Sequence, residues 1–242
     1  MSTVRIWAVE SDYDRDAAGK LAKKLVNWLK LDSVIIKTAG KTTYNSVVSR
    51  KKPNALQIAV ESYLQNNEDK VIFVIDSDSE VALTQKRKEP YSYISQIERI
   101  AKSDKFRNKV FLAMAVQELE AWFLTDCVGI CCYFFKTRYS KEKCRESVTT
   151  NESFQAIIAK HQKGNTELIV EPLKGGRGAK EYLIKFSEEL LKTLNPKMKH
   201  RNIDAYKYRE ALAPEIADYI EVGKDSLLRN KSLQKFSELL AE

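Results

Sequence analysis

Apolar residues form two kinds of pattern along this chain. Four short blocks are typical of β-strands, at residues 4–9, 34–37, 71–75 and 109–116. The blocks VIFVI (71–75) and KVFLAMAV (109–116) are continuous, as in strands buried on both faces of a parallel sheet. The pattern therefore predicts a mainly parallel sheet.

Between these blocks, apolar residues recur at the spacing of one helical face. The first such face comprises Leu21, Leu25, Trp28 and Leu29. Residues 55–66 and 90–102 also have helical faces, whereas residues 38–55 are typical of a polar connection. Because strands and helices alternate, we expect an α/β domain over residues 1–126, with helices flanking the sheet.

The remaining residues, 127–242, are mostly helical in pattern. AKEYLIKFSEELLKTL (179–194) has a clear apolar face, and SLQKFSELL (232–240) is amphipathic with Ser232 placed as its N-cap. We expect this helical C-terminal part to pack on the α/β domain.

Composition narrows the class of protein. The 242 residues are 43% hydrophobic, which is enough for one sizeable core. No run approaches the roughly 18–20 apolar residues of a membrane span, and the first residues, MSTVRIWAVESDYD, lack the regions of a signal peptide. We therefore expect a cytoplasmic protein without a membrane partner.

Cysteine and histidine usage excludes several chemistries. The four cysteines make no CxxC pair, so reduced or buried thiols are favoured over a zinc site. The cysteines are Cys127, Cys131, Cys132 and Cys144. The two histidines, His161 and His200, have no partner at ligand spacing, which weighs against histidine nucleases, zinc proteases and Ser-His-Asp triads.

Acidic residues follow three of the predicted strands, at the point where each ends. Glu10 follows the first strand, Asp76 and Asp78 the third, and Glu118 and Glu120 the fourth. The carboxyl ends of parallel strands meet at one edge of a sheet, where α/β proteins build their sites. These acids would repel one another there, and a divalent metal such as Mg²⁺ or Mn²⁺ would neutralise them. The net charge of +8 suits a polyanionic partner such as nucleic acid.

Two details of this acidic set stay open in the sequence. Asp14 is either a metal ligand or a helix cap, and one of Asp12, Asp14 and Asp16 is expected to cap the helix that follows. Glu118 and Glu120 point about 200° apart on a helix but share a face in extended chain.

The same motifs resemble the Toprim fold, the catalytic domain of topoisomerases, primases, recombination proteins and OLD-family nucleases. The resemblance lies in AVES with Glu10 and Asp14, and in the strand ending in DSD at residues 76–78. AVQELEAWFL (115–124) is similar to the Toprim-like branch catalogued as domain-of-unknown-function family 4276, and the RloB-like branch has a similar Glu-x-Trp. DAYKYREALAPEIADYI (204–220) resembles a late element of that family.

The resemblance implies a role for each matching position. Glu10 would be a metal ligand or the general acid/base, and Asp76 and Asp78 would hold Mg²⁺. Asp14 and Glu120 would complete a second metal position, so that two metals clamp a phosphoryl displacement.

A basic residue would assist the transition state, and the late element offers Arg209 or Lys207 for that role. A separate glycine-rich stretch, LKGGRGAKEY, offers Lys174, Arg177 and Lys180 either as phosphate contacts or as a linker before a helix.

The leading hypothesis is a Mg²⁺-dependent nuclease acting on DNA or RNA. Family context implies an effector of a prokaryotic antiphage defence system beside an ATPase, which would be a separate chain because GKTT (40–43) does not complete a Walker A motif. The alternatives are a catalytically weak Toprim-like subunit that recruits nucleic acid or an ATPase, and a phosphorylation receiver domain. The receiver reading is disfavoured because QELEAW follows the strand after which a receiver would place lysine.

Overall fold

The four apolar blocks form the strands of a parallel sheet. The computed structural model describes residues 2–48, 54–65, 69–78, 80–138, 140–169 and 178–242. Within them the strands are β1 (Ser2–Ala8), β2 (Val34–Ala39), β3 (Lys70–Asp76) and β4 (Val110–Ala115). Their order is β2-β1-β3-β4, with every neighbouring pair parallel. The chain therefore has an α/β fold, as predicted.

Burial along the strands follows their place in the sheet. The central strand β3 has six consecutive buried residues, whereas the edge strand β2 alternates half-buried with exposed positions until its last residue. A central strand is covered on both faces, which is why the continuous block VIFVI lies there.

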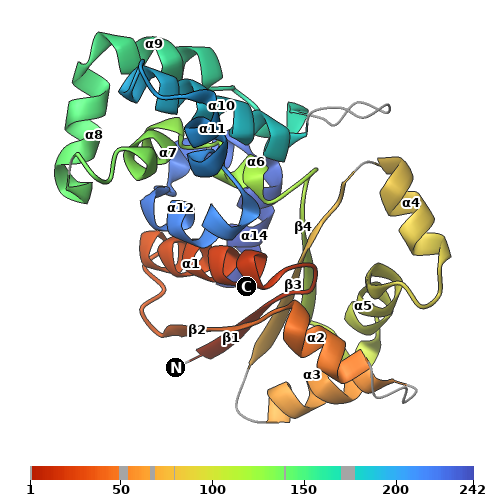
Figure 1. Ribbon diagram of the computed structural model, residues 1–242. Coiled ribbons are helices and arrows are strands. Elements are labelled where there is room, and N and C mark those ends of the chain that lie inside the picture. Colours follow the sequence, from red (N-terminus) through yellow and green to blue (C-terminus); the bar gives the residue numbers. More distant parts are fainter. Residues whose placement is uncertain (1, 49–53, 66–68, 79, 139, 170–177) are drawn as a thin grey trace. The chain divides into compact units, whose positions relative to one another are not determined.

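Helices cover both faces of this sheet (Figure 1). One face packs with α2 (Lys41–Val48), α3 (Ala55–Gln65) and α5 (Tyr93–Ala101), around Trp7, Phe73 and other apolar side chains. α1 (Asp12–Trp28) contacts β1 and β2 through its buried alanines and leucines. The last helix, α14 (Lys231–Ala241), accepts a hydrogen bond at the Leu239 carbonyl from Lys70 Nζ of β3 (2.8 Å).

The division of the chain into compact units places α14 with the sheet. The first unit comprises residues 1–116 and 232–242, and the second comprises residues 117–231. The expected division into residues 1–126 and 127–242 differs from this one in two segments. Residues 117–126 belong with the helices that follow them, and residues 232–242 return to the sheet unit.

Several local expectations differ from the structure. The predicted polar connection contains α2, which buries only Tyr44 and Val47 and so has little apolar signal. Trp28 was expected inward but is 42% exposed. Ser232 does not precede α14, because the helix begins at Lys231. Its hydroxyl instead accepts the Val116 backbone N–H (3.2 Å), beyond the end of β4.

The second unit consists of helices and their connections. They are α6 (Glu120–Phe123), α7 (Cys127–Phe134), α8 (Lys141–Thr150), α9 (Glu152–His161), α10 (Ala179–Leu194), α11 (His200–Tyr206), α12 (Ala213–Tyr219) and α13 (Lys224–Arg229). In the described part of the chain, no helix is both long enough and apolar enough to cross a membrane.

A disulfide joins α7 to α8. It links Cys132 to Cys144, whereas Cys127 and Cys131 are free thiols, both buried. All four cysteines are buried, as one of the two expected alternatives, but Cys132 and Cys144 are not reduced thiols. The spacing of cysteines along the sequence did not indicate this pair, since the two helices bring the sulfurs together only in the folded unit.

Candidate functional site

The first candidate site lies at the carboxyl edge of the sheet, between β1 and β3. From β1 the chain passes to β2 on one side, while β3 pairs with β1 on the other. Neighbouring strands whose connections diverge form a topological switch point, where open α/β sheets bind their ligands. Glu10 follows β1, and Asp76 and Asp78 lie at the end of β3, so three predicted site residues surround this point.

Glu10 connects the two strand ends directly. Its Oε2 atom accepts a hydrogen bond from the Asp76 backbone N–H (2.7 Å), and its Oε1 atom accepts one from the Tyr93 hydroxyl of α5. Burial, followed by the hydrogen bond to Glu10, raises the pKa of Tyr93, so this phenol stays a donor at neutral pH. The structure thus brings Glu10 and Asp76 together, as the sequence predicted.

A lysine occupies the space between the carboxylates. Lys86 Nζ, from α4 (Glu80–Lys88), lies 2.5 Å from Asp78 Oδ2 and 3.6 Å from Glu10 Oε1, and donates to Tyr93 Oη at 2.7 Å. Burial would lower the pKa of Lys86, but its hydrogen bonds to Asp78 and Tyr93 outweigh burial and raise that pKa. Asp78 has a left-handed backbone (φ 49°), a conformation that aspartate adopts more readily than most residues. We call Lys86, Glu10, Asp78 and Tyr93 the Lys86 cluster.

Asp14 lies in the first turn of α1, four residues after Glu10 in the sequence. The helix cap is Ser11, whose hydroxyl accepts the N–H groups of Tyr13 (3.0 Å) and Asp14 (3.4 Å). The prediction that one of the three aspartates provides this cap is therefore wrong. The Asp12 carboxylate accepts hydrogen bonds from Arg15 and Thr42, and the Asp16 carboxylate accepts from Arg15. The serine directly before the three aspartates was the signal for the cap, since serine is a preferred N-cap.

In the second unit, Glu118 caps a helix from a distance. Gly178 precedes α10 and has no side chain to cap it, and Glu118 Oε2 accepts the Lys180 N–H in the first turn of that helix (2.7 Å). A Cβ on Gly178 would lie 2.9 Å from the same oxygen, so glycine leaves room for the carboxylate. Burial, together with the nearby charges of Glu120 and Glu181, raises the pKa of Glu118 to about 7.

Glu120 begins α6 and is almost fully buried, at 5% exposure. Its Oε1 atom accepts a hydrogen bond from the Tyr208 hydroxyl (2.6 Å), and burial raises its pKa. Glu118 precedes the helix while Glu120 starts it, so neither of the two regular geometries considered from the sequence applies to the pair.

Lys180 supplies the countercharge in this unit. Its Nζ atom lies 3.1 Å from Glu210 Oε2. Burial would lower the pKa of Lys180, but Glu210, Glu120 and Glu118 outweigh burial and raise it. We call Lys180, Glu118, Glu120 and Glu210 the Lys180 cluster. The charge of Lys180, expected to contact nucleic acid, is thus matched by carboxylates of its own unit.

Each unit therefore resolves the repulsion among its acids with an ammonium group. Among the described residues, no group of three or more His, Cys, Asp or Glu side chains is arranged to hold a metal ion. The donors of the Lys86 cluster still fit Mg²⁺ in chemistry, because carboxylate oxygens are its usual protein ligands. Next to Lys180 in the chain, Glu181 Oε2 is buried without a hydrogen-bond partner among the described atoms.

The remaining predicted residues are not members of the two clusters as defined. Lys207 pairs with Asp204 (2.9 Å) and Glu188 (3.1 Å), which neutralise its charge. Arg209 is exposed and lines an apolar pocket of the second unit. Lys174 and Arg177 lie outside the residues that the structure describes.

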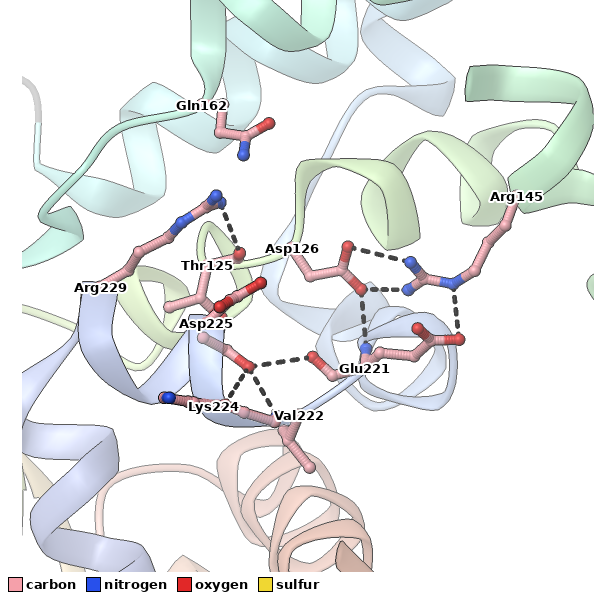
Figure 2. A pocket seen from close by; sticks show the side chains of 11 residues that line it. Thr125, Asp126, Arg145, Gln162, Glu221, Val222, Lys224, Asp225 and Arg229 are labelled. Atoms are coloured by element: carbon pink, nitrogen blue, oxygen red, sulfur yellow. Dashed lines mark hydrogen bonds and ion pairs between the residues drawn. The ribbon is translucent and has the colours of Figure 1, made fainter. Parts of the chain in front are cut away.

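A polar pocket in the second unit is built around Asp126 (Figure 2). Asp126 Oδ1 accepts the Gly129 N–H at the start of α7 (3.0 Å), while Oδ2 accepts the Glu221 N–H (2.7 Å) and binds Arg145. Arg145 also pairs with Glu221 (2.7 Å). Because these charged groups pair with one another, the network has a structural role. It connects residues 221–223 to α7 and α8.

Sequence reasoning missed Lys86, Tyr93 and Tyr208 as members of the clusters. The available signal was position: three basic residues, 86–88, end the helix that begins just after DSDS. A cation two turns beyond two aspartates can fold back onto them.

Comparisons with known proteins found no matching family model, no matching curated protein and no matching solved structure. The resemblance to Toprim proteins consequently rests on the short sequence motifs quoted above.

Proposed function

We propose that this protein is a Mg²⁺-dependent nuclease that hydrolyses phosphodiester bonds in DNA or RNA at the Lys86 cluster. The observation that carries the proposal is that Glu10, Asp76 and Asp78, from the ends of two central strands, gather at the switch point, with the ammonium of Lys86 between Glu10 and Asp78. A site that already binds one cation among its carboxylates has the donors for another.

Asp76 and the residues of the Lys86 cluster have defined parts in this proposal. Asp76 and Asp78 would hold the metal, whose contribution is to neutralise charge on the phosphate oxygens. Glu10 orients the end of β3 through the Asp76 N–H and presents its second oxygen to Tyr93. Lys86 keeps the carboxylates together before metal binds and offers a positive charge to the substrate phosphate. A cytoplasmic role as a defence effector beside a separate ATPase is part of the same proposal.

The test separates metal binding from cleavage. Plasmid, single-stranded DNA and tRNA are incubated with Mg²⁺, Mn²⁺ or EDTA, and Mn²⁺ binding is measured separately by calorimetry. Glu10→Gln and Asp76→Asn are expected to abolish cleavage, and Asp76→Asn to weaken Mn²⁺ binding. Asp32→Asn is the matched control, because Asp32 precedes β2 at the opposite edge of the sheet. Cleavage that persists in EDTA or in both site variants would refute the proposal.

A second candidate is a Toprim-like subunit that binds nucleic acid without cutting it. The contact that favours it is the 2.5 Å pair between Lys86 and Asp78, which already neutralises a carboxylate that a nuclease would give to metal. Binding of nucleic acid in EDTA, with no Mn²⁺ uptake and no cleavage, would select this candidate.

A further inference from the structure

The second unit contains an apolar pocket with a basic rim. Its volume is about 590 Å³, within the usual range for small-molecule sites. It lies among the end of α7, the end of α10 and the segment from α11 to α12. We call it the Arg209 pocket.

The walls of the Arg209 pocket suit a flat aromatic group. Leu191, Leu194 and Met198 provide apolar surface, and Tyr133 and Tyr206 provide rings. Tyr206 is 63% exposed, so its ring is available to a ligand. Base–aromatic stacking is the main source of sequence-tolerant binding to single strands.

The rim of the pocket carries excess positive charge. Three cations, Lys136, Arg138 and Arg209, face one carboxylate, Glu215. Lys136 pairs with Glu215 (2.5 Å), and Arg138 donates to the Leu194 carbonyl (2.8 Å). In the described part of the structure the Arg209 guanidinium has no hydrogen bond or ion pair. This differs from the Asp126 pocket of Figure 2, in which Arg145 pairs with both Asp126 and Glu221.

We propose that the Arg209 pocket binds one nucleotide of a single-stranded nucleic acid, with the base against Tyr206 and a phosphate on Arg209. A guanidinium fork matches phosphate oxygens in geometry and charge. The proposal deepens the proposed function, on which its meaning for catalysis rests, by naming single strands as the substrate class. Binding itself needs only residues of the second unit, so it can be measured without cleavage.

The experiment is fluorescence anisotropy in EDTA with the full chain. The probes are a labelled oligothymidylate, its RNA counterpart and a duplex, with a free mononucleotide as competitor. We expect both single strands to bind more tightly than the duplex. Arg209→Gln and Tyr206→Ala should each weaken single-strand binding about tenfold. Arg209→Gln should also reduce the salt slope by about 0.7, the value for one lost phosphate contact on a single strand.

The control variants are Arg201→Gln, an exposed arginine of α11 outside the pocket, and Tyr91→Ala, a tyrosine that is 90% exposed in the first unit. Both should bind like the parent protein. Equal weakening by pocket and control variants, duplex preference or absence of single-strand binding would overturn the proposal. Competition by mononucleotide near the affinity of the strand would assign the pocket to free nucleotides and overturn the strand assignment. Single-strand binding that requires Arg209 and Tyr206, without cleavage, would uphold the pocket while the nuclease proposal fails.

Discussion

Glu10 Oε2 accepts the backbone N–H of Asp76 at 2.7 Å, and this contact joins the segment just beyond β1 to the last residue of β3. The Glu10 carboxylate therefore has a structural role, whatever its role in catalysis. It fixes the relative positions of two strand ends that are 66 residues apart in sequence.

We expect Glu10→Gln to lower the free energy of unfolding by about 1–2 kcal/mol, since hydrogen bonds to a charged acceptor are lost or weakened. The amide keeps one oxygen for the Asp76 N–H, but its NH₂ group cannot accept from Tyr93. Urea denaturation measures the change, and Asp32→Asn should leave the midpoint unaltered. An unchanged midpoint for Glu10→Gln would show that the contact does not stabilise the strand ends.

Lys86→Met tests the lysine as the resident cation. Without the ammonium, Glu10 and Asp78 lose their shared partner, and we expect stability in EDTA to fall by about 1–2 kcal/mol. Mn²⁺ should then bind several-fold more tightly than in the parent protein, because no ammonium competes for the carboxylates, and should restore thermal stability.

The control for this variant is Lys102→Met, whose lysine side chain is 76% exposed and pairs with Glu98 on the surface. Calorimetry with Mn²⁺ and thermal melting in EDTA provide the two readouts. Unaltered Mn²⁺ affinity combined with unaltered stability would contradict the assignment of Lys86 as the countercharge.

Glu118 predicts a pH dependence of stability. Its pKa is raised from 4.5 to about 7 in the folded protein, so between these values the folded state binds more protons than the unfolded state. Stability from this group is therefore full below pH 4.5 and is lost as the pH rises to about 7. Allowing for solvent screening at this half-buried position, we expect a loss of about 2 kcal/mol.

Glu118→Gln should remove this contribution while keeping an oxygen for the Lys180 N–H. The variant should match the parent at low pH and exceed it in stability above neutral pH. Chemical denaturation across the pH range measures the difference, with the exposed Glu146→Gln as control. A difference that does not change with pH would exclude Glu118 as its source.

The Asp126 network predicts a large effect on stability. Asp126→Ala removes the side-chain cap of α7, the acceptor for Glu221 N–H and a partner of Arg145. We expect a loss of about 3 kcal/mol, because a partly buried guanidinium loses a carboxylate together with the cap. Asp126→Asn keeps an oxygen acceptor and should lose less. A double-mutant cycle with Arg145→Met separates the ion pair from the cap, and additive effects would refute their coupling.

The Cys132–Cys144 disulfide should contribute about 3 kcal/mol, the value for a loop closed by a separation of 12 residues. Thermal melting with and without a phosphine reductant should show a lower Tm after reduction, and Cys144→Ser should abolish the response. Disulfides are rare in reducing compartments. The oxidation state of this pair after rapid alkylation of intact cells therefore also tests the expected cytoplasmic location.

The strands and the first candidate site were predictable because the determining signals are local. VIFVI predicts a strand buried on both faces, and a parallel sheet brings Glu10 and Asp76 to one edge whatever the details of the helices. Other hydrogen-bond partners of the acids were not predictable in this way. Tyr93 is 83 residues from Glu10, and the Lys180 N–H is 62 residues from Glu118, so both contacts depend on tertiary packing.

The misjudged details have physical reasons as well. Residues 41–48 form α2 although their composition is polar, because burying Tyr44 and Val47 against the sheet is sufficient there. Ser11 outcompetes three neighbouring aspartates as a cap because it stands at the extended residue just before the helix. The resemblance to Toprim proteins led to the acids themselves, but motif matching carries no information about which groups neutralise them.

The position of α14 has a consequence for synthesis on the ribosome. The sheet unit is discontinuous, because residues 117–231 are made between β4 and the helix that returns to Lys70. The helical unit can thus finish folding first. Until residues 232–242 are made, part of the apolar surface of the earlier strands stays uncovered. Nascent chains arrested before residue 232 should accordingly engage chaperones through β1 and β3, and release them once the final segment emerges.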